Sequence, residues 1–310
     1  MNSIKNIINS SLFKVTSLNS VSVIIKIAIG LVTSNVIALF VGPSGMALVG
    51  NLRNFVSSVE ALGTLGFENG VVKYVSENKQ DNSKLKTTIS TVFFTISVSC
   101  LIIGFTLLIF SDYFNESVFG NLSYGYIIKF LVVALPFYIG NIFLTAIING
   151  LGNYKKVIFI NIVGNILGLI TSLVLITQFH IKGALFAIIL TPSLLFFVSL
   201  YFISNEINIT KFISFKEIRF SELKNFTSFT IMVLVSSVFG PLVFLAIRHH
   251  IIDDLGMNQA GYWEAINRIS SYYFLFITSI LGIYFLPKLA ISKTYKETNT
   301  LILSYFKGVF

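Results

Sequence analysis

Long apolar runs separated by short polar segments recur along most of this chain. Eight of these runs are long enough to cross a hydrocarbon core about 30 Å thick, and a ninth begins near residue 300. The eight spans are predicted over residues 17–41, 45–72, 87–110, 126–150, 157–179, 184–203, 226–252 and 257–286. A membrane β-barrel would show segments of about ten residues with alternating polarity, and the sequence lacks that pattern. The chain is therefore predicted to be an all-α polytopic membrane protein.

The composition of the 310 residues agrees with this class, since 55% are hydrophobic, only 11% are charged and the mean hydropathy is +0.84. Soluble domains carry about 25% charged residues. The formal net charge of +9 is explained by basic membrane loops, so a nucleic-acid partner is not expected. Cys100 is the single cysteine, which excludes disulfides and zinc clusters within the chain. No small-residue cleavage site follows the first apolar run, so this run is expected to remain as the first span.

The distribution of lysine and arginine predicts how the spans are oriented. One set of alternate loops is rich in basic residues, namely Lys73, Lys79, Lys84, Lys86, Lys155, Lys156, Lys211, Lys216, Arg219, Lys224, Lys288, Lys293 and Lys296. The other set holds Lys182 alone, together with Asp112, Glu116, Asp253 and Asp254. Because basic loops are retained in the cytoplasm, the N-terminus and the first set of loops are predicted to be cytoplasmic.

An internal repeat appears when the sequence is compared with itself at an offset of 211 residues. Gly45-Met46 then matches Gly256-Met257, and Gly50 matches Gly261. Spans one and two correspond to spans seven and eight, which gives parallel six-helix repeats related by an axis along the membrane normal, as in some secondary transporters. We therefore expect a first lobe over residues 1–205, a cytoplasmic linker over 206–225 and an incomplete second lobe over 226–310.

Ionisable residues at span depth are the candidate functional groups, because each costs about 2.5–3.5 kcal/mol in the membrane unless it faces a cavity or a partner. The predicted cavity residues are Lys26, Arg53, Glu60, Arg248, Glu264 and Arg268. Structural pairing within the bundle is the alternative for each of them. Glu264 and Arg268 are four residues apart and could pair along one helix. The repeat also places Glu264 at the position equivalent to Arg53, and opposite charges at such positions would suit two helices that face one cleft.

Other polar and aromatic residues have simpler interpretations. Glu68 and Lys129 lie near span ends, where their side chains can reach the interface. His249-His250 beside Asp253-Asp254 is interpreted as the solvent-exposed end of a span (a wetted span end) rather than as a metal or proton site. The aromatic residues of the last span lie at the interface or stack on sugar rings: Tyr262, Trp263, Tyr272 and Tyr273. No catalytic residue, metal site or cofactor is predicted, and no nucleotide-binding motif follows a strand.

A basic cleft between two helical lobes favours an anionic substrate, because phosphate oxygens pair well with arginine and lysine. An anionic headgroup could cross through such a cleft while its lipid tail stays in the bilayer. This reasoning from the residues indicates a transporter of a charged lipid.

Two segments carry a resemblance to a known family. The first runs through residues 38–45, continues with Gly50, Asn54 and Phe55, and ends at 66–74; the second holds Gly261, Trp263, Ala265 and residues 268–270. Both are similar to the O-antigen translocases (Wzx type), in the polysaccharide-transport branch of the superfamily that includes the MATE exporters. The resemblance implies a MATE-like two-lobe bundle. Family members have about twelve spans, whereas this chain stops within the ninth.

The resemblance further implies a flippase that moves undecaprenyl-pyrophosphate-linked O-antigen repeat units across the bacterial inner membrane by alternating access. Lys26, Arg53, Arg248 and Arg268 would then engage the pyrophosphate and the sugars. Membrane lipids and O-antigen assembly proteins are the implied partners, and H⁺ or Na⁺ would be the coupling ion. Two alternatives stay open: a cation-coupled small-molecule exporter, which would use Glu60 or Glu68, and a membrane enzyme of polysaccharide assembly.

Overall fold

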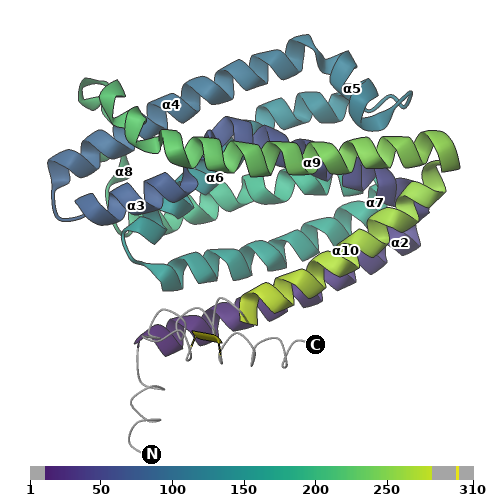
Figure 1. Ribbon diagram of the computed structural model, residues 1–310, viewed down its shortest axis with the longest axis horizontal. Helices are drawn as coiled ribbons and strands as arrows, with labels where there is room; N and C mark the ends of the chain where they lie inside the picture. The colour runs from purple at the N-terminus through teal and green to yellow at the C-terminus, as the bar shows by residue number, and fades with distance from the viewer. Residues whose placement is uncertain (1–10, 281–297, 300–310) are drawn as a thin grey trace, which may run out of the picture.

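The computed structural model describes residues 11–280 and 298–299, and the described chain is helical without a strand. The predicted ninth span and residues 281–286 of the eighth lie outside these residues. The long helices pack side by side in one bundle (Figure 1). The elements are α2 (Ser11–Thr64), α3 (Glu68–Asn78), α4 (Asn82–Ile109), α5 (Ser111–Phe119), α6 (Gly125–Gly150), α7 (Tyr154–Ser204), α8 (Ile209–Phe212), η1 (Phe215–Glu217), η2 (Phe220–Phe226), α9 (Thr227–Leu255) and α10 (Met257–Ile280).

Two of the elements, α2 and α7, are each a pair of helices joined at one non-helical residue, Gly42 in α2 and His180 in α7. Their halves correspond to the predicted spans one and two, and five and six. Five stretches of the described chain are long and apolar enough to cross a membrane: Asn19–Asn78, Asn82–Ile109, Gly125–Gly150, Tyr154–Ser204 and Val235–Leu255. The described part of α10, which carries Glu264 and Arg268, is not among them. The chain is thus a multi-pass membrane protein.

Two predicted boundaries are wrong. The second span was expected to run to residue 72, but α2 ends at Thr64 because Leu65 and Gly66 take positive φ angles of 52° and 65°. A new helix, α3, then begins at Glu68. The loop predicted after the third span instead contains the short helix α5.

Four turns at one end of the bundle share an unusual backbone conformation, and this end is called the turn end below. The residues are Gly42, Gly120, His180 and Gly256, with φ angles of 75°, 63°, 51° and 91°. Glycine adopts positive φ at little cost because it has no Cβ. His180 is the exception, and side chains rarely tolerate this region.

The predicted repeat pairs the turn at Gly42 with the turn at Gly256. Their ψ angles are −178° and 164°, so the two residues have nearly the same conformation. They lie 214 residues apart, whereas the sequence comparison used an offset of 211 and matched Gly45 with Gly256. A shift of three residues is close to one helical turn, so side chains matched at either offset fall on similar faces.

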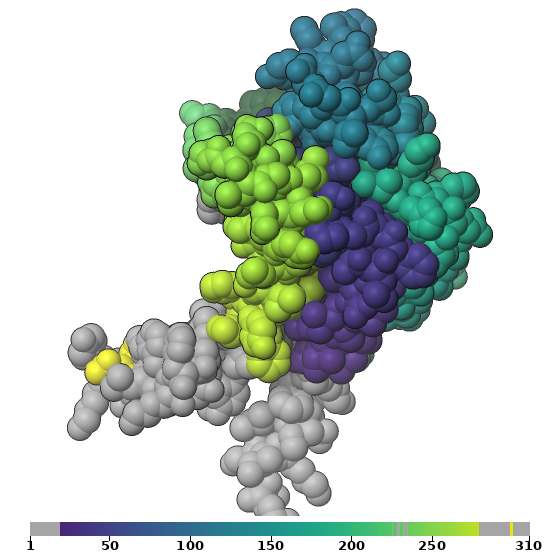
Figure 2. All heavy atoms as spheres, turned by 90° about the vertical axis from the view of Figure 1, so that its right-hand side faces the viewer, coloured from purple at the N-terminus to yellow at the C-terminus, as the bar shows by residue number. Residues whose placement is uncertain are grey.

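α2 has its most extensive contacts with α7, α10 and α9. The yellow-green end of α9 and α10 abuts the purple α2 at the turn end (Figure 2). Gly261 permits this approach, since the carbonyl of Pro43 occupies the space that a Cβ would need. Small residues serve this purpose in many membrane helix pairs.

Residues 206–225, predicted to form a linker between lobes, lie along α4 rather than free of the bundle. The Ser90 hydroxyl donates to the Phe212 carbonyl at 2.8 Å and accepts from the Ser214 N–H at 3.0 Å. The Arg219 N–H donates to the Thr91 hydroxyl at 3.0 Å. The division into lobes at this segment remains a prediction.

Candidate functional site

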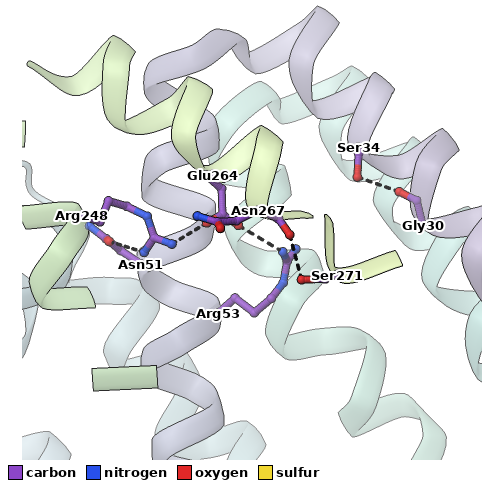
Figure 3. Close-up of polar contacts among 8 residues, drawn as sticks. All are labelled: Gly30, Ser34, Asn51, Arg53, Arg248, Glu264, Asn267 and Ser271. Carbon is purple, nitrogen blue, oxygen red and sulfur yellow. Dashed lines mark hydrogen bonds and ion pairs between the residues drawn. The ribbon is translucent and has the colours of Figure 1, made fainter. Parts of the chain in front are cut away.

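A buried arginine anchors the candidate site between α2, α9 and α10. Arg248 on α9 is 1% exposed and donates to the Asn51 side-chain oxygen at 2.7 Å. Its other terminal nitrogen forms a hydrogen-bonded ion pair with Glu264 (Figure 3). Asn51 donates in turn to the Val118 carbonyl at 2.9 Å, and the guanidinium lies 5.3 Å from the centre of the Trp263 ring. These contacts fix Arg248 in place.

Glu264 has a second basic partner across the helix interface. Arg53 on α2 approaches the carboxylate at 3.7 Å, and its side chain is 38% exposed (Figure 3). Arg53 and Glu264, which the repeat places at equivalent positions, line the same cavity. The predicted pair of Glu264 with Arg268 is wrong, because within the described residues the carboxylate points to α2 and α9 instead.

Gly50 makes this arrangement possible. A Cβ at this position would lie 2.6 Å from the Glu264 carboxylate and 2.9 Å from the Arg248 guanidinium carbon. Glycine therefore lets the buried ion pair rest directly against the backbone of α2.

A chamber of about 350 Å³ adjoins this network and is called the smaller chamber. Its charged wall residues are Arg53, Arg248, Arg268 and Glu264. Three guanidinium groups and one carboxylate leave a formal charge of +2 around the space. Such a balance favours an anion of two charges.

Four buried side-chain nitrogens lack a hydrogen-bond partner among the described residues, and all four belong to residues of the smaller chamber. They are Asn54 Nδ2, Arg248 Nε, Asn267 Nδ2 and one terminal nitrogen of Arg268. All are donors, and an unpaired buried donor costs about 1–3 kcal/mol. A ligand rich in acceptor oxygens would satisfy donors of this kind.

A second cavity of about 440 Å³, the larger chamber, is bounded by both halves of α2 and α7 together with α6 and α10. Its charged wall residues are Lys26, Arg53 and Arg268. Neutral polar groups make up much of the rest of the wall: Thr33, Ser57, Tyr138, Asn165, Ser172, Thr191 and Tyr272. Arg53, Arg268 and Tyr272 line both chambers, which therefore meet at these residues.

The structure brings five of the six predicted site residues to these chambers, and Glu60 is the exception. Its carboxylate accepts a hydrogen bond of 2.7 Å from the Tyr138 hydroxyl, and Tyr138 lines the larger chamber. Sequence reasoning missed Asn51, Asn54 and Asn267. The signal that could have found them is an amide side chain in an apolar span, close in sequence to Arg53 or Glu264.

At the ends of the helices, the polar residues behave as surface groups. His250 lies 3.3 Å from Asp254, and both are exposed, in keeping with the expected wetted span end. A hydrogen bond from the Lys156 ammonium lowers the pKa of Glu206. The Asp81 side chain caps the start of α4. Its carboxylate oxygen accepts hydrogen bonds of 3.1 Å from the backbone N–H groups of Lys84 and Ser83, and these bonds lower the pKa of Asp81.

The fold indicates the class of protein to which this chain is similar. The bundle is similar to solved MATE-family transporters of the MOP superfamily, including an inward-facing multidrug resistance transporter with a TM-score of 0.74, 14% identity, and coverage of 92% of this chain and 70% of that chain. The multidrug transporter DinF-BH gives a TM-score of 0.69 at 16% identity, with 96% and 69% coverage. The predicted all-α, MATE-like fold is confirmed.

The family follows from the sequence comparison. Residues 12–291 match the family model described as polysaccharide biosynthesis protein, and the chain belongs to that family. The lipid III flippases of Escherichia coli K12 and Shigella flexneri are each 25% identical over 297 residues, covering 90% of this chain and 67% of the relatives. The resemblance to the polysaccharide-transport branch of the superfamily is thereby confirmed.

Proposed function

We propose that this chain moves a polyprenyl-diphosphate-linked oligosaccharide across the membrane. The observation that carries the proposal is the smaller chamber, with its charge of +2 and four unpartnered donors. The names of the curated relatives support the same class of substrate. Family membership favours a transporter over an enzyme of polysaccharide assembly.

The diphosphate is the part of such a substrate that fits the smaller chamber. A diphosphate joined to lipid and sugar carries two negative charges, which balance the net charge of the wall. Guanidinium groups bind phosphate oxygens through paired, charge-assisted hydrogen bonds. Arg53 and Arg268 would make these contacts, because Arg248 is held by Asn51 and Glu264.

Alternating access supplies the transport mechanism in this proposal. The contacts of α2 with α9 and α10 at the turn end would hold one side closed, and their release would open it. The higher TM-score against the inward-facing transporter, 0.74 compared with 0.60 for the outward-facing form, supports a state closed at the turn end. With the N-terminus in the cytoplasm, the turn end faces outward.

The finer assignments are part of the proposal. The membrane is the bacterial inner membrane, the lipid is undecaprenyl diphosphate and the saccharide is an O-antigen repeat unit. H⁺ or Na⁺ drives the cycle, and O-antigen assembly proteins supply and take up the saccharide.

A cation-coupled exporter of small molecules is the second candidate function. Glu60 favours it, because its carboxylate has no cationic partner within 4.0 Å among the described residues and meets the larger chamber through Tyr138. Such an exporter would bind cationic compounds, which the basic chambers disfavour. Binding of an organic cation that is lost in Glu60→Gln would support this alternative.

A flipping assay tests the leading proposal. Purified protein is placed in liposomes that contain a fluorescent undecaprenyl-diphosphate oligosaccharide, and a membrane-impermeant quencher reports which leaflet holds the label. We expect protein-dependent exchange between leaflets, and at least a tenfold loss of rate in Arg268→Gln. Lys129→Gln is the matched control, because Lys129 is exposed on α6 and lines neither chamber. Absence of exchange with the unaltered protein would contradict the proposal.

A further inference from the structure

A basic and aromatic surface lies outside both chambers, on the segment that joins α7 to α9. This segment, residues 209–226, is called the interface segment and contains α8, η1 and η2. Figure 1 shows it beside α4, at the opposite end of the bundle from the turn end. None of its described side chains lines either chamber, so the proposed function does not use this surface.

The inner side of the interface segment is fastened to the bundle. Phe226 is 1% exposed, and its ring centre lies 5.0 Å from that of Phe67 and 4.9 Å from that of Tyr74. The hydrogen bonds with the hydroxyls of Ser90 and Thr91 hold the backbone of the segment against α4. The interface segment therefore presents a fixed outer surface.

That outer surface combines exposed aromatic rings with positive charge. Phe215 is 77% exposed and Phe220 is 65% exposed, although aromatic rings usually bury most of their surface. The segment also carries four exposed basic residues: Lys211, Lys216, Arg219 and Lys224. Its two acidic residues, Glu217 and Glu222, are less exposed, and Lys86 of α4 pairs with Glu217 at 3.7 Å. The exposed charge is therefore mainly positive.

Contacts with α4 indicate the depth of this surface in the membrane. Lys86 lies at the charged start of α4, where it pairs with Glu217. The Phe215 ring packs edge-on against Phe94, with ring centres 5.2 Å apart. Phe94 is eight residues after Lys86, about 12 Å along the helix axis, in the part of α4 that is apolar enough to cross a membrane. The interface segment thus extends from the level of the headgroups to the acyl chains, as interfacial amphipathic segments do.

An anionic phospholipid matches both properties of the surface. Clusters of about four or more lysine and arginine residues next to a membrane span attract anionic headgroups, and aromatic rings are favoured at the boundary between headgroups and acyl chains. A zwitterionic lipid would leave the excess positive charge without a counterion. A soluble acidic protein would not cover a ring at the depth of Phe94.

We propose that the interface segment is a binding surface for anionic glycerophospholipids. The lipid phosphate contacts Lys216 and Arg219, and the acyl chains lie against Phe215 and Phe220. The lipid is a bound component of the folded protein and not the transported substrate. Because the interface segment joins α7 to α9, a lipid held there also fastens this connection to the side of α4.

Lipid titration of the purified protein in a non-ionic detergent tests the need for charge. Phosphatidylglycerol and phosphatidylcholine with the same acyl chains are compared, and native mass spectrometry counts the bound lipids and gives their affinities. We expect the tightest phosphatidylglycerol site to be at least about tenfold weaker in Lys216→Gln/Arg219→Gln, because each cation near an anionic membrane surface contributes about fivefold. Phosphatidylcholine binding should be unchanged, which shows that the variant is folded.

Lys129→Gln/Lys155→Gln is the matched control, because it removes two exposed cations that lie outside the interface segment. It should keep the tightest phosphatidylglycerol site. Equal weakening by the two double variants would overturn the proposal, as would an unchanged affinity in Lys216→Gln/Arg219→Gln.

Phe220→Trp tests whether the surface lies in the membrane. The variant is placed in vesicles of phosphatidylglycerol and brominated phosphatidylcholine, and the unaltered protein, whose single tryptophan is Trp263, gives the background fluorescence. We expect the bromine atoms to quench the added fluorescence and aqueous iodide to have little effect. Quenching by iodide alone would overturn the proposal and indicate a surface that faces water, as a soluble acidic partner would require.

Discussion

The two helical hairpins that face each other across the smaller chamber have the same backbone turn and different charges. The first is α2, bent at Gly42, and the second is α9 with α10, joined at Gly256. Arg53 is the charge that the first hairpin contributes to the chamber, while the second contributes Arg248, Glu264 and Arg268. The turn geometry of the repeat is shared, but the charged side chains are not.

This difference shows how a repeated fold can hold an asymmetric site. Each hairpin provides one glycine at the interface: Gly50 leaves room for the Arg248–Glu264 pair, and Gly261 leaves room for the Pro43 carbonyl. The same close approach thus admits an ion pair at one position and backbone contact at the other. The asymmetry of charge follows from the side chains, whereas the approach of the helices follows from the glycines.

The largest effect on stability is expected at Arg248, one of the charges that the second hairpin alone contributes. Arg248→Ala should lower the free energy of unfolding by about 3–5 kcal/mol, because it leaves the Glu264 carboxylate without its closest partner in a buried site. The measurement is thermal unfolding in detergent.

The double variant Arg248→Ala/Glu264→Ala controls this experiment. It should recover part of the loss, since both charges are removed together. A double variant that is less stable than Arg248→Ala would contradict the assignment of the ion pair.

Gly50→Ala tests whether the ion pair needs the glycine on the first hairpin. The added methyl group would meet the carboxylate at 2.6 Å and the guanidinium at 2.9 Å, so a loss of about 1–3 kcal/mol is expected from overpacking. Gly240→Ala is the matched control, because a Cβ there has open space. That change should be neutral or stabilise the helix by about 1 kcal/mol. Equal stabilities of the two variants would count against tight packing at Gly50.

Gly42→Ala and Gly256→Ala sharpen the comparison of the two turns. Both positions have positive φ and open space around them, so strain is the main cost. Each change should lower stability by about 1–2 kcal/mol, and the two losses should agree within about 0.5 kcal/mol. A clear loss at one glycine alone, measured by thermal unfolding, would break the equivalence of the turns.

The smallest effect is expected outside the chambers, at the ion pair of Glu206 with Lys156. The pair lowers the pKa of Glu206, so its stabilisation is present above the ordinary carboxyl pKa and disappears as pH falls through the lowered value. Glu206→Gln should cost about 0.5 kcal/mol at neutral pH, and the cost should shrink as pH falls below the ordinary carboxyl pKa. A difference that is constant over this range of pH would contradict the ion pair.

The sequence predicted the helices well because the membrane penalises nearly every polar residue in a span. It pairs Gly45 with Gly256, whereas the positive φ angle of the first turn lies at Gly42. The break after Thr64 was missed for a similar reason, since apolar residues continue through Leu65 into α3.

The charged site residues could be predicted because their burial is costly, but their partners could not. Glu264 pairs with Arg53 and Arg248 because α10 packs against both helices that carry them, which depends on tertiary contacts. The expected pairing with Arg268 used helical spacing alone. Asn51 and Asn54 were not predicted as site residues because an amide is a weaker signal than a charge.

Binding of undecaprenyl diphosphate without a sugar tests the central claim most directly, namely that the smaller chamber holds the diphosphate. The affinities of the unaltered protein, Arg268→Gln and the control Lys129→Gln are measured side by side in detergent. We predict that Arg268→Gln weakens binding at least tenfold while Lys129→Gln has no effect. Equal binding by all three proteins would contradict the claim.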